Sequence, residues 1–139
     1  MYSWIVKQAL RKLEKQLSGG EVDKLMAAYA DDAVLVFPGE SSWSGEHRGR
    51  GAIRAWLERF VAQKPTFNLG DAAVAGPPWN MRIFFTFSDQ IAAPDGFDYR
   101  NAGMEYVRMR FGKIVEHRVA LDTQKVAELD GHLQQATAA

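Results

Sequence analysis

Hydrophobic residues spaced three to four positions apart predict helices in the first half of the chain. The segment from Trp4 to Leu17 has this spacing and is followed by Gly19 and Gly20, and glycine is common just after a helix C-terminus. The segments from Glu21 to Tyr29 and from Gly51 to Gln63 show the same spacing. Each predicted helix therefore has one apolar face that must be buried against another element.

Strand patterns dominate the second half of the chain. Runs rich in hydrophobic and β-branched residues predict five strands: Ala33 to Phe37, Phe67 to Val74, Trp79 to Ile91, Tyr99 to Met109 and Lys113 to Leu121. The serine- and glycine-rich stretch 40–51 predicts a loop, and a last short helix is expected near Asp122, capped by Asp122 or Thr123. Helices followed by antiparallel hairpins favour an α+β domain, with a curved antiparallel sheet packed on three helices.

Size and charge narrow the function classes. The chain has 139 residues, which suits one domain, here 1–133, with a disordered tail at 134–139. Its 17 basic and 17 acidic residues balance, so we expect neither nucleic acid nor a membrane as a partner. Lys7, Arg11 and Lys12 interrupt the N-terminal apolar residues, which argues against a signal peptide and favours a cytoplasmic protein. The chain has no cysteine and only three separated histidines, so we expect no metal and no cofactor.

The last predicted hairpin brings an acid and a histidine together. A three-residue loop, Arg110 to Gly112, would place Glu105 directly opposite His117 on the more apolar face of the sheet. Such a pair can be a neutral proton-sharing couple or an ion pair, and either can exchange a proton near neutral pH. Glu105 and His117 are therefore the candidate catalytic residues. Pocket polarity without catalysis, and a purely structural role in fixing the register, remain open alternatives.

Three sequence blocks carry a family resemblance: Gly20–Asp23 with Tyr29–Ala33, Gly45–Ile53, and Gly112–Arg118 with Asp122-Thr123. Their order resembles the nuclear-transport-factor-2-like (NTF2-like) superfamily, in particular its SnoaL-like branch, which is related to polyketide cyclases and ketosteroid isomerases. The resemblance implies a cone-shaped fold with a pocket for a small hydrophobic molecule between the helices and the sheet. It also implies dimers formed through the convex sheet face.

The same alignment shows that the catalytic residues of three known chemistries are mostly replaced. Of the steroid isomerase groups only a carboxylic acid remains, at Glu105, while the proton-shuttle aspartate is replaced by Phe37 and the tyrosine by Leu13. In SnoaL-type cyclases His117 matches, but the acid two residues later is replaced by Val119. The limonene-epoxide hydrolase positions are occupied by Leu35, Phe37, Thr86, Ser88 and Val119.

Alternation along the strands, together with this alignment, predicts which residues line the pocket and which face outward. The predicted pocket residues are Leu13, Leu35, Phe37, Trp43, Trp56, Phe60, Thr86, Ser88, Asn101, Val119 and Leu121. Trp43 is equally compatible with plain core packing. Because Thr86 and Ser88 are aligned inward, the other side of the long strand faces outward and predicts a homodimer interface, formed by Met81, Ile83, Phe85 and Phe87. The alternative is that this strand is inverted and these four side chains belong to the core.

Three functions remain compatible with the sequence. The first is an isomerase, cyclase or lyase that transfers a proton on a small apolar cyclic substrate with Glu105 and His117. The second is a carrier that binds a small hydrophobic ligand without turnover. The third is a protein-interaction module whose cone is filled by side chains.

Overall fold

The computed structural model describes residues 3–138. The helices are α1 (Ser3–Ser18), α2 (Val22–Met26), α3 (Gly49–Ala62) and α4 (Thr123–Ala138). The strands are β1 (Tyr29–Phe37), β2 (Gly45–Arg48), β3 (Thr66–Ala75), β4 (Asn80–Ala92), β5 (Asp98–Arg110) and β6 (Lys113–Leu121). Two differences from the predicted elements matter for the site: Tyr29 begins a strand instead of ending a helix, and the predicted loop contains β2. Helix α4 also continues through positions 134–138, where a disordered tail was predicted, while Ala139 lies outside the described residues.

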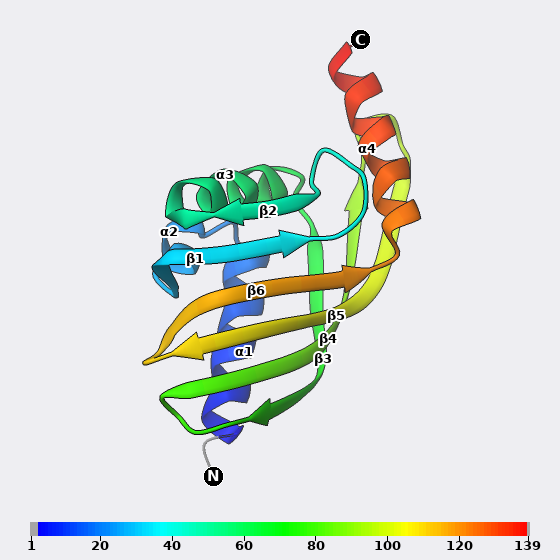
Figure 1. The fold of residues 1–139 in the computed structure, drawn as a ribbon. Coiled ribbons are helices and arrows are strands. Elements are labelled where there is room, and N and C mark those ends of the chain that lie inside the picture. The colour runs from blue at the N-terminus through cyan, green and yellow to red at the C-terminus, as the bar shows by residue number, and fades with distance from the viewer. Residues whose placement is uncertain (1–2, 139) are drawn as a thin grey trace.

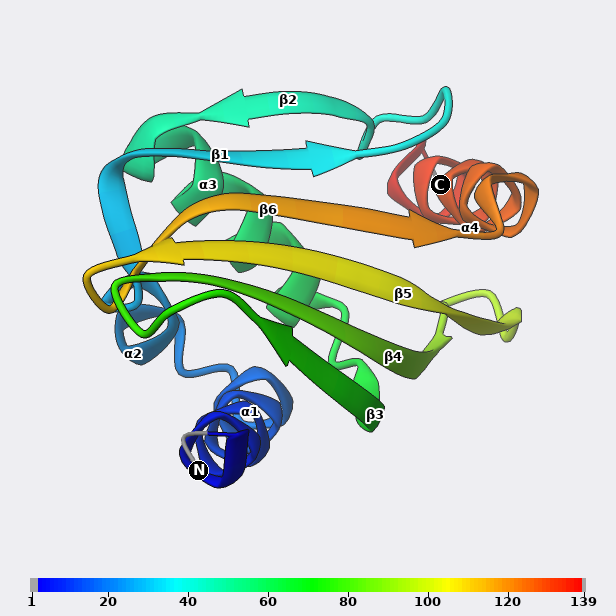
Figure 2. The ribbon, with the colours of Figure 1, turned by 60° about the horizontal axis from the view of Figure 1, so that its bottom comes forward.

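The six strands form one curved sheet in the order β2-β1-β6-β5-β4-β3. All neighbouring pairs are antiparallel except β1 and β6, which are parallel. Helices α1 and α3 lie on the same side of the sheet, and α4 lies at the end where β1 and β6 finish (Figures 1 and 2). This arrangement confirms the α+β, NTF2-like fold class.

The β5–β6 hairpin differs from its predicted register. Its loop has two residues, Phe111 and Gly112, with φ angles of 48° and 79°, as in the hairpin turns that need positive φ at both positions. The pairing then shifts at a bulge between Arg108 and Met109, so that Glu105 lies opposite Val119 and Val107 lies opposite His117. The direct pairing of Glu105 with His117 is therefore wrong by two residues. Because a shift of two preserves the alternation, both side chains still lie on the same face of the sheet.

Strand β4 has the opposite orientation to the predicted one. Ile83, Phe85 and Phe87 are buried in the core, and Met81 is packed against it, so these residues form no outer surface. Thr86 and Ser88 are exposed and point away from the cavity. The physical reason is the hydrophobic effect, because the side of the strand with more apolar side chains is the side that packs against the helices.

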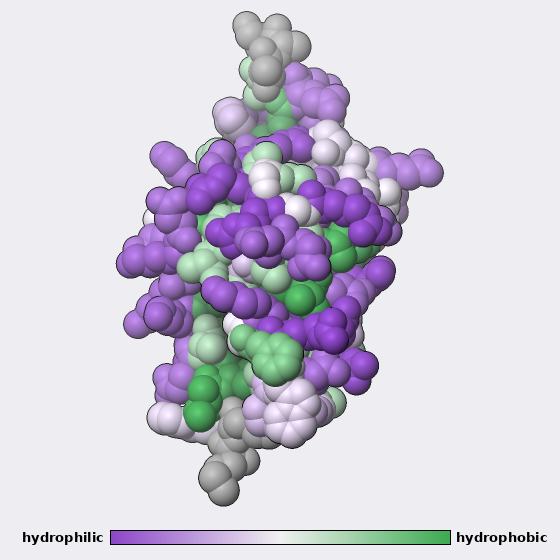
Figure 3. All heavy atoms as spheres, turned by 60° about the vertical axis from the view of Figure 1, so that its left-hand side comes forward, coloured by the Kyte–Doolittle hydropathy of each residue, from purple (hydrophilic) through white to green (hydrophobic). Residues whose placement is uncertain are grey.

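Some large hydrophobic side chains remain exposed. Phe84 on β4 and Met104 on β5 are 39% and 52% exposed on the outer face of the sheet. Figure 3 shows a largely hydrophilic side of the molecule on which hydrophobic groups gather near the N-terminal end. Phe111, in the β5–β6 turn, is 80% exposed. Between residues 3 and 138 no helix has the length and apolar character needed to cross a membrane.

The orientation of β4 can be tested with two adjacent phenylalanines. Replacing Phe85 by Ala should lower the free energy of unfolding by about 3 kcal/mol, because it removes a ring from the core. In the monomeric state, replacing Phe84 by Ala should change it by less than about 1 kcal/mol, because that ring is partly solvated there. Urea denaturation of both variants measures the difference. Equal losses, or a larger loss for Phe84→Ala, would contradict the orientation described here.

Candidate functional site

A cavity of about 80 Å³ lies between the helices and the inner face of the sheet. Its wall is mainly hydrocarbon and aromatic, and it is closed at one end by Val126 and Leu129 of α4. Nine of the residues proposed from sequence as pocket or catalytic residues line it: Leu13, Phe37, Trp43, Trp56, Phe60, Glu105, His117, Val119 and Leu121.

Four predicted pocket residues lie elsewhere. Leu35 is only 1% exposed but belongs to the core and does not reach the cavity. Thr86 and Ser88 face outward, as the corrected orientation of β4 requires. Asn101 is buried behind the cavity wall, where its amide nitrogen donates to Tyr99 Oη at 3.0 Å and to the carbonyl oxygen of Asp122 at 2.9 Å. Asn101 therefore ties β5 to the end of β6.

Glu105 and His117 are in contact on the inner face of the sheet. His117 Nε2 lies 2.5 Å from Glu105 Oε1, and both side chains are nearly buried. His117 Nδ1 lies 2.8 Å from Tyr29 Oη, so the three groups form a chain across β1, β6 and β5. Tyr29 was not predicted as a site residue, because the hydrophobic spacing placed it in a helix. The bulge before Met109 and the start of β1 at Tyr29 together position this chain.

The phenol of Tyr29 keeps its proton, because burial, with a smaller contribution from the charge of Glu105, raises the pKa of Tyr29 above its usual range. The Tyr29 hydroxyl can donate to His117 Nδ1 of a neutral imidazole whose Nε2–H donates to Glu105, or accept from Nδ1–H of a protonated imidazole that forms an ion pair with Glu105. Both arrangements hold the acid and the imidazole in contact in the wall of the apolar cavity.

A second acid, Asp89 on β4, also lines the cavity. It is 8% exposed, and its Oδ1 atom has no hydrogen-bond partner among the described residues. Burial raises the pKa of Asp89 to about 7, and the nearby charge of Glu105 adds to the increase. Buried polar atoms in proteins are nearly always paired, so an unpaired one in a cavity wall indicates a functional position.

The neighbours of Asp89 explain why it is unpaired. Asn101 is its direct cross-strand partner on β5, but the Asn101 amide hydrogens are already donated to Tyr99 and Asp122. On the other side, Phe67 is its partner on β3 and offers no polar side-chain group. The sequence does contain a signal for Asp89. Side chains alternate along a strand, so Asp89 lies on the same side of β4 as Phe85 and Phe87. Assigning that apolar side to the interior would also have placed Asp89 toward the pocket.

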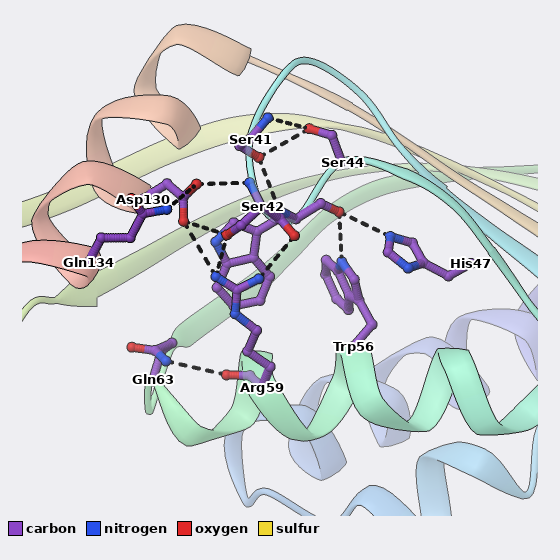
Figure 4. A network of polar contacts seen from close by, with 10 residues as sticks. Ser41, Ser42, Ser44, His47, Trp56, Arg59, Gln63, Asp130 and Gln134 are labelled. Atoms are coloured by element: carbon purple, nitrogen blue, oxygen red, sulfur yellow. Dashed lines mark hydrogen bonds and ion pairs between the residues drawn. The ribbon is translucent and has the colours of Figure 1, made fainter. Parts of the chain in front are cut away.

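A polar network, called the closing network below, joins α4 and α3 to the loop that carries the cavity-lining Trp43 (Figure 4). Asp130 of α4 accepts hydrogen bonds from the backbone N–H and hydroxyl of Ser42, at 2.8 and 2.5 Å, and forms an ion pair with Arg59 of α3. The Arg59 guanidinium lies 3.8 Å from the centre of the Trp43 ring, which favours a cation–π contact. Trp56 Nε1 donates to the Trp43 carbonyl oxygen at 3.1 Å. The loop that carries Trp43 is thereby fixed to two helices over the cavity.

Comparison with known proteins agrees with this architecture. Residues 10–117 match the SnoaL-like domain. The chain belongs to the SnoaL-like family. No curated protein sequence shows significant similarity to this SnoaL-like chain.

Solved structures similar to this SnoaL-like protein share its fold at low sequence identity. Bal32a, from a soil-derived mobile gene cassette, has a TM-score of 0.79 and 17% identity, covering 89% of this chain and 95% of its own. SalBIII, an epoxide hydrolase/cyclase-like enzyme in pyran ring formation in the polyether salinomycin, has a TM-score of 0.71 and 16% identity, with coverage of 86% and 92%. Rv0760c from Mycobacterium tuberculosis, solved with estradiol-17β-hemisuccinate, has a TM-score of 0.71 and 18% identity, with coverage of 81% and 89%.

The unpaired state of Asp89 has a measurable effect on stability. Its pKa is about 7 in the folded protein against 3.8 for the free side chain, so the folded state holds the proton more tightly. The stabilising contribution of this group is therefore present below pH 4 and is lost as the pH rises to about 7. Asp89→Asn removes the titration. The stability of the variant relative to the wild type should thus increase by up to about 4 kcal/mol between pH 4 and pH 8, measured by urea denaturation.

Asp71→Asn is the matched control, because Asp71 is exposed on the neighbouring strand β3. Its stability relative to the wild type should stay nearly constant over the same pH range. A constant difference for Asp89→Asn as well would show that Asp89 is solvated or paired in solution.

Proposed function

We propose that this protein binds a small, largely apolar molecule in the cavity and transfers a proton on it with Glu105 and His117. The observation that carries the proposal is the chain Tyr29–His117–Glu105 in the wall of an apolar cavity. An enclosed apolar pocket with a few convergent polar groups is typical of small-molecule sites. The isomerase/cyclase class is supported by family membership, and SalBIII acts in ring formation.

Glu105 is the base in this proposal. Its carboxylate takes a proton from an acidified C–H or O–H of the bound molecule and returns a proton to another atom of the same molecule, which is an isomerisation without redox change. His117 Nε2–H stabilises the carboxylate through its hydrogen bond and orients it. Tyr29 orients the imidazole through Nδ1. A ligand that fills the cavity would displace water from these groups, which strengthens each of these interactions.

Proton abstraction can be measured without knowing the substrate. In D₂O, the protein should accelerate deuterium incorporation next to the carbonyl group of cyclopentanone, followed by NMR. Glu105→Gln should lower this rate by about a hundredfold or more, because the amide is not a base. Glu116→Gln is the control, since Glu116 lies one residue before His117 but pairs with Arg108 and Arg118. Exchange at the wild-type rate in Glu105→Gln, with the fold intact, would refute the role of Glu105.

A carrier without turnover is the second candidate function. It is favoured by the nearly continuous hydrocarbon lining of the cavity and by the replacement of relatives' catalytic positions, for example by Phe37 and Val119. A carrier should bind ligand normally after Glu105→Gln and lose binding after Phe37→Asp, which places a charge in the apolar wall.

We also propose that the protein forms a homodimer through the outer face of the sheet. The residues differ from those predicted from sequence, because the outward parity of β4 and β5 carries Phe84, Met104 and Tyr106. These three residues, with Val36, Pro38, Arg118 and Ala120, line a hollow of about 340 Å³ on that face. Exposed apolar groups around a surface hollow are typical of an interface. A second copy related by a two-fold axis would bury the same face on both subunits.

Light scattering coupled to gel filtration tests this interface. The wild type should be a dimer at micromolar concentration, and Met104→Asp should be a monomer, because a buried unpaired charge opposes association. Phe111→Asp changes a more exposed apolar residue in the β5–β6 turn, away from this face, and should remain a dimer. A monomeric wild type, or a monomer only after Phe111→Asp, would rule out the outer sheet face.

A further inference from the structure

The cavity has an uneven balance of charged groups. Two carboxyl side chains, Glu105 and Asp89, and one imidazole, His117, line it, whereas no lysine or arginine among the described residues does so. The nearby cation, Arg59, lies against Trp43 and pairs with Asp130 in the closing network. Glu105 is in contact with His117, whereas Asp89 has no basic partner among the lining residues. Ionised Asp89 therefore makes the potential inside the cavity negative.

The remaining wall is unusually rich in aromatic rings. Nine of the lining residues are Phe, Trp or Tyr, from β1, α3, β3, β4, β5 and the loop before β2. Several pack on one another, as Trp56 does with Phe60 and Trp43 at ring-centre distances of 5.5 and 5.6 Å. Aromatic faces carry partial negative charge and attract cations, most strongly where water is excluded.

The unpaired Oδ1 atom of Asp89 indicates which kind of group would complete the site, namely a hydrogen-bond donor. Oδ1 of a buried carboxylate accepts hydrogen bonds, and no described side chain or backbone group donates one to it. The Asn101 amide cannot supply one, because both of its hydrogens are donated elsewhere, and the nearby Tyr99 hydroxyl makes no hydrogen bond to Oδ1. A donor on the ligand would complete the pairing, and a positively charged donor would also balance the charge of ionised Asp89.

We propose that the ligand of this cavity is a small apolar amine, bound as its ammonium ion with the N⁺–H group on Asp89 and the hydrocarbon part against the aromatic wall. This inference rests on the proposed function of the same pocket and narrows its ligand class. A buried carboxylate together with an ammonium ion forms a charge-assisted hydrogen bond, which is stronger than a neutral one. The cavity of about 80 Å³ is smaller than the ~150 Å³ cavity known to hold benzene, so the apolar part is short.

Isobutylamine, isobutanol and isovalerate form a probe set with one branched hydrocarbon part and a positive, neutral or negative head. Binding is followed by chemical-shift changes of the tryptophan indole N–H groups on titration. At pH 8 isobutylamine should bind at least tenfold more tightly than isobutanol, and isovalerate should not bind measurably. Asp89→Asn should remove the preference for the amine and leave isobutanol binding within about threefold. Asp71→Asn should behave like the wild type.

The pH dependence gives an independent readout. The groups that face Asp89 are Glu105 and Tyr99 on β5 and, across the cavity, His117 on β6. Protonation of Asp89 below its pKa of about 7 removes the acceptor charge, so the affinity for isobutylamine should fall towards tenfold per pH unit between pH 7 and pH 5. In Asp89→Asn this decrease should disappear.

The outcomes distinguish this inference from the proposed function. Equal binding of isobutanol and isobutylamine, or an amine preference that survives Asp89→Asn, would overturn the amine assignment while deuterium exchange through Glu105 stands. Absence of binding by all three probes would also overturn it. Loss of exchange in Glu105→Gln together with amine binding lost in Asp89→Asn would support both.

Discussion

Polar groups in an apolar cavity are costly unless each finds a partner, and this constraint separates the two acids of the pocket. Glu105 meets it within the protein, through His117 and then Tyr29, so that three strands supply one continuous chain of hydrogen bonds. Asp89 does not meet it, and its carboxyl group is left facing the cavity with a raised pKa. The first acid is thus set in place by the fold, whereas the second depends on what enters the cavity.

The charged groups of the closing network near α4 are paired, in contrast to Asp89. Asp130, Ser42 and Arg59 satisfy one another and attach the Trp43 loop to α3 and α4 (Figure 4). Buried charge is therefore well compensated at the rim and poorly compensated inside. Such a contrast concentrates the electrostatic effect of the protein on the small volume where a ligand would lie.

The fold and part of the site follow from sequence because hydrophobic periodicity reports burial directly. Leu13, Trp56 and Phe60 lie on the inward faces of their helices, as the spacing of hydrophobic residues indicates. The orientation of β4 was wrong because the alignment turned Thr86 and Ser88 inward, against the more apolar Phe85 and Phe87. Tyr29 and Asp89 could not be identified, because one depends on the exact start of a strand and the other on the orientation of β4.

The β5–β6 hairpin shows how the contact between an acid and an imidazole can be preserved by a turn and a bulge that offset each other. A tight turn of two residues alone would direct the imidazole of His117 to the opposite side of the sheet from Glu105, and the extra residue at the bulge returns it. Turn length and bulge therefore behave as one unit in this hairpin. In related chains, a one-residue insertion in the turn can accompany loss of the bulge without separating the acid from the imidazole, so the number of residues between them is a poor guide to whether the pair is present.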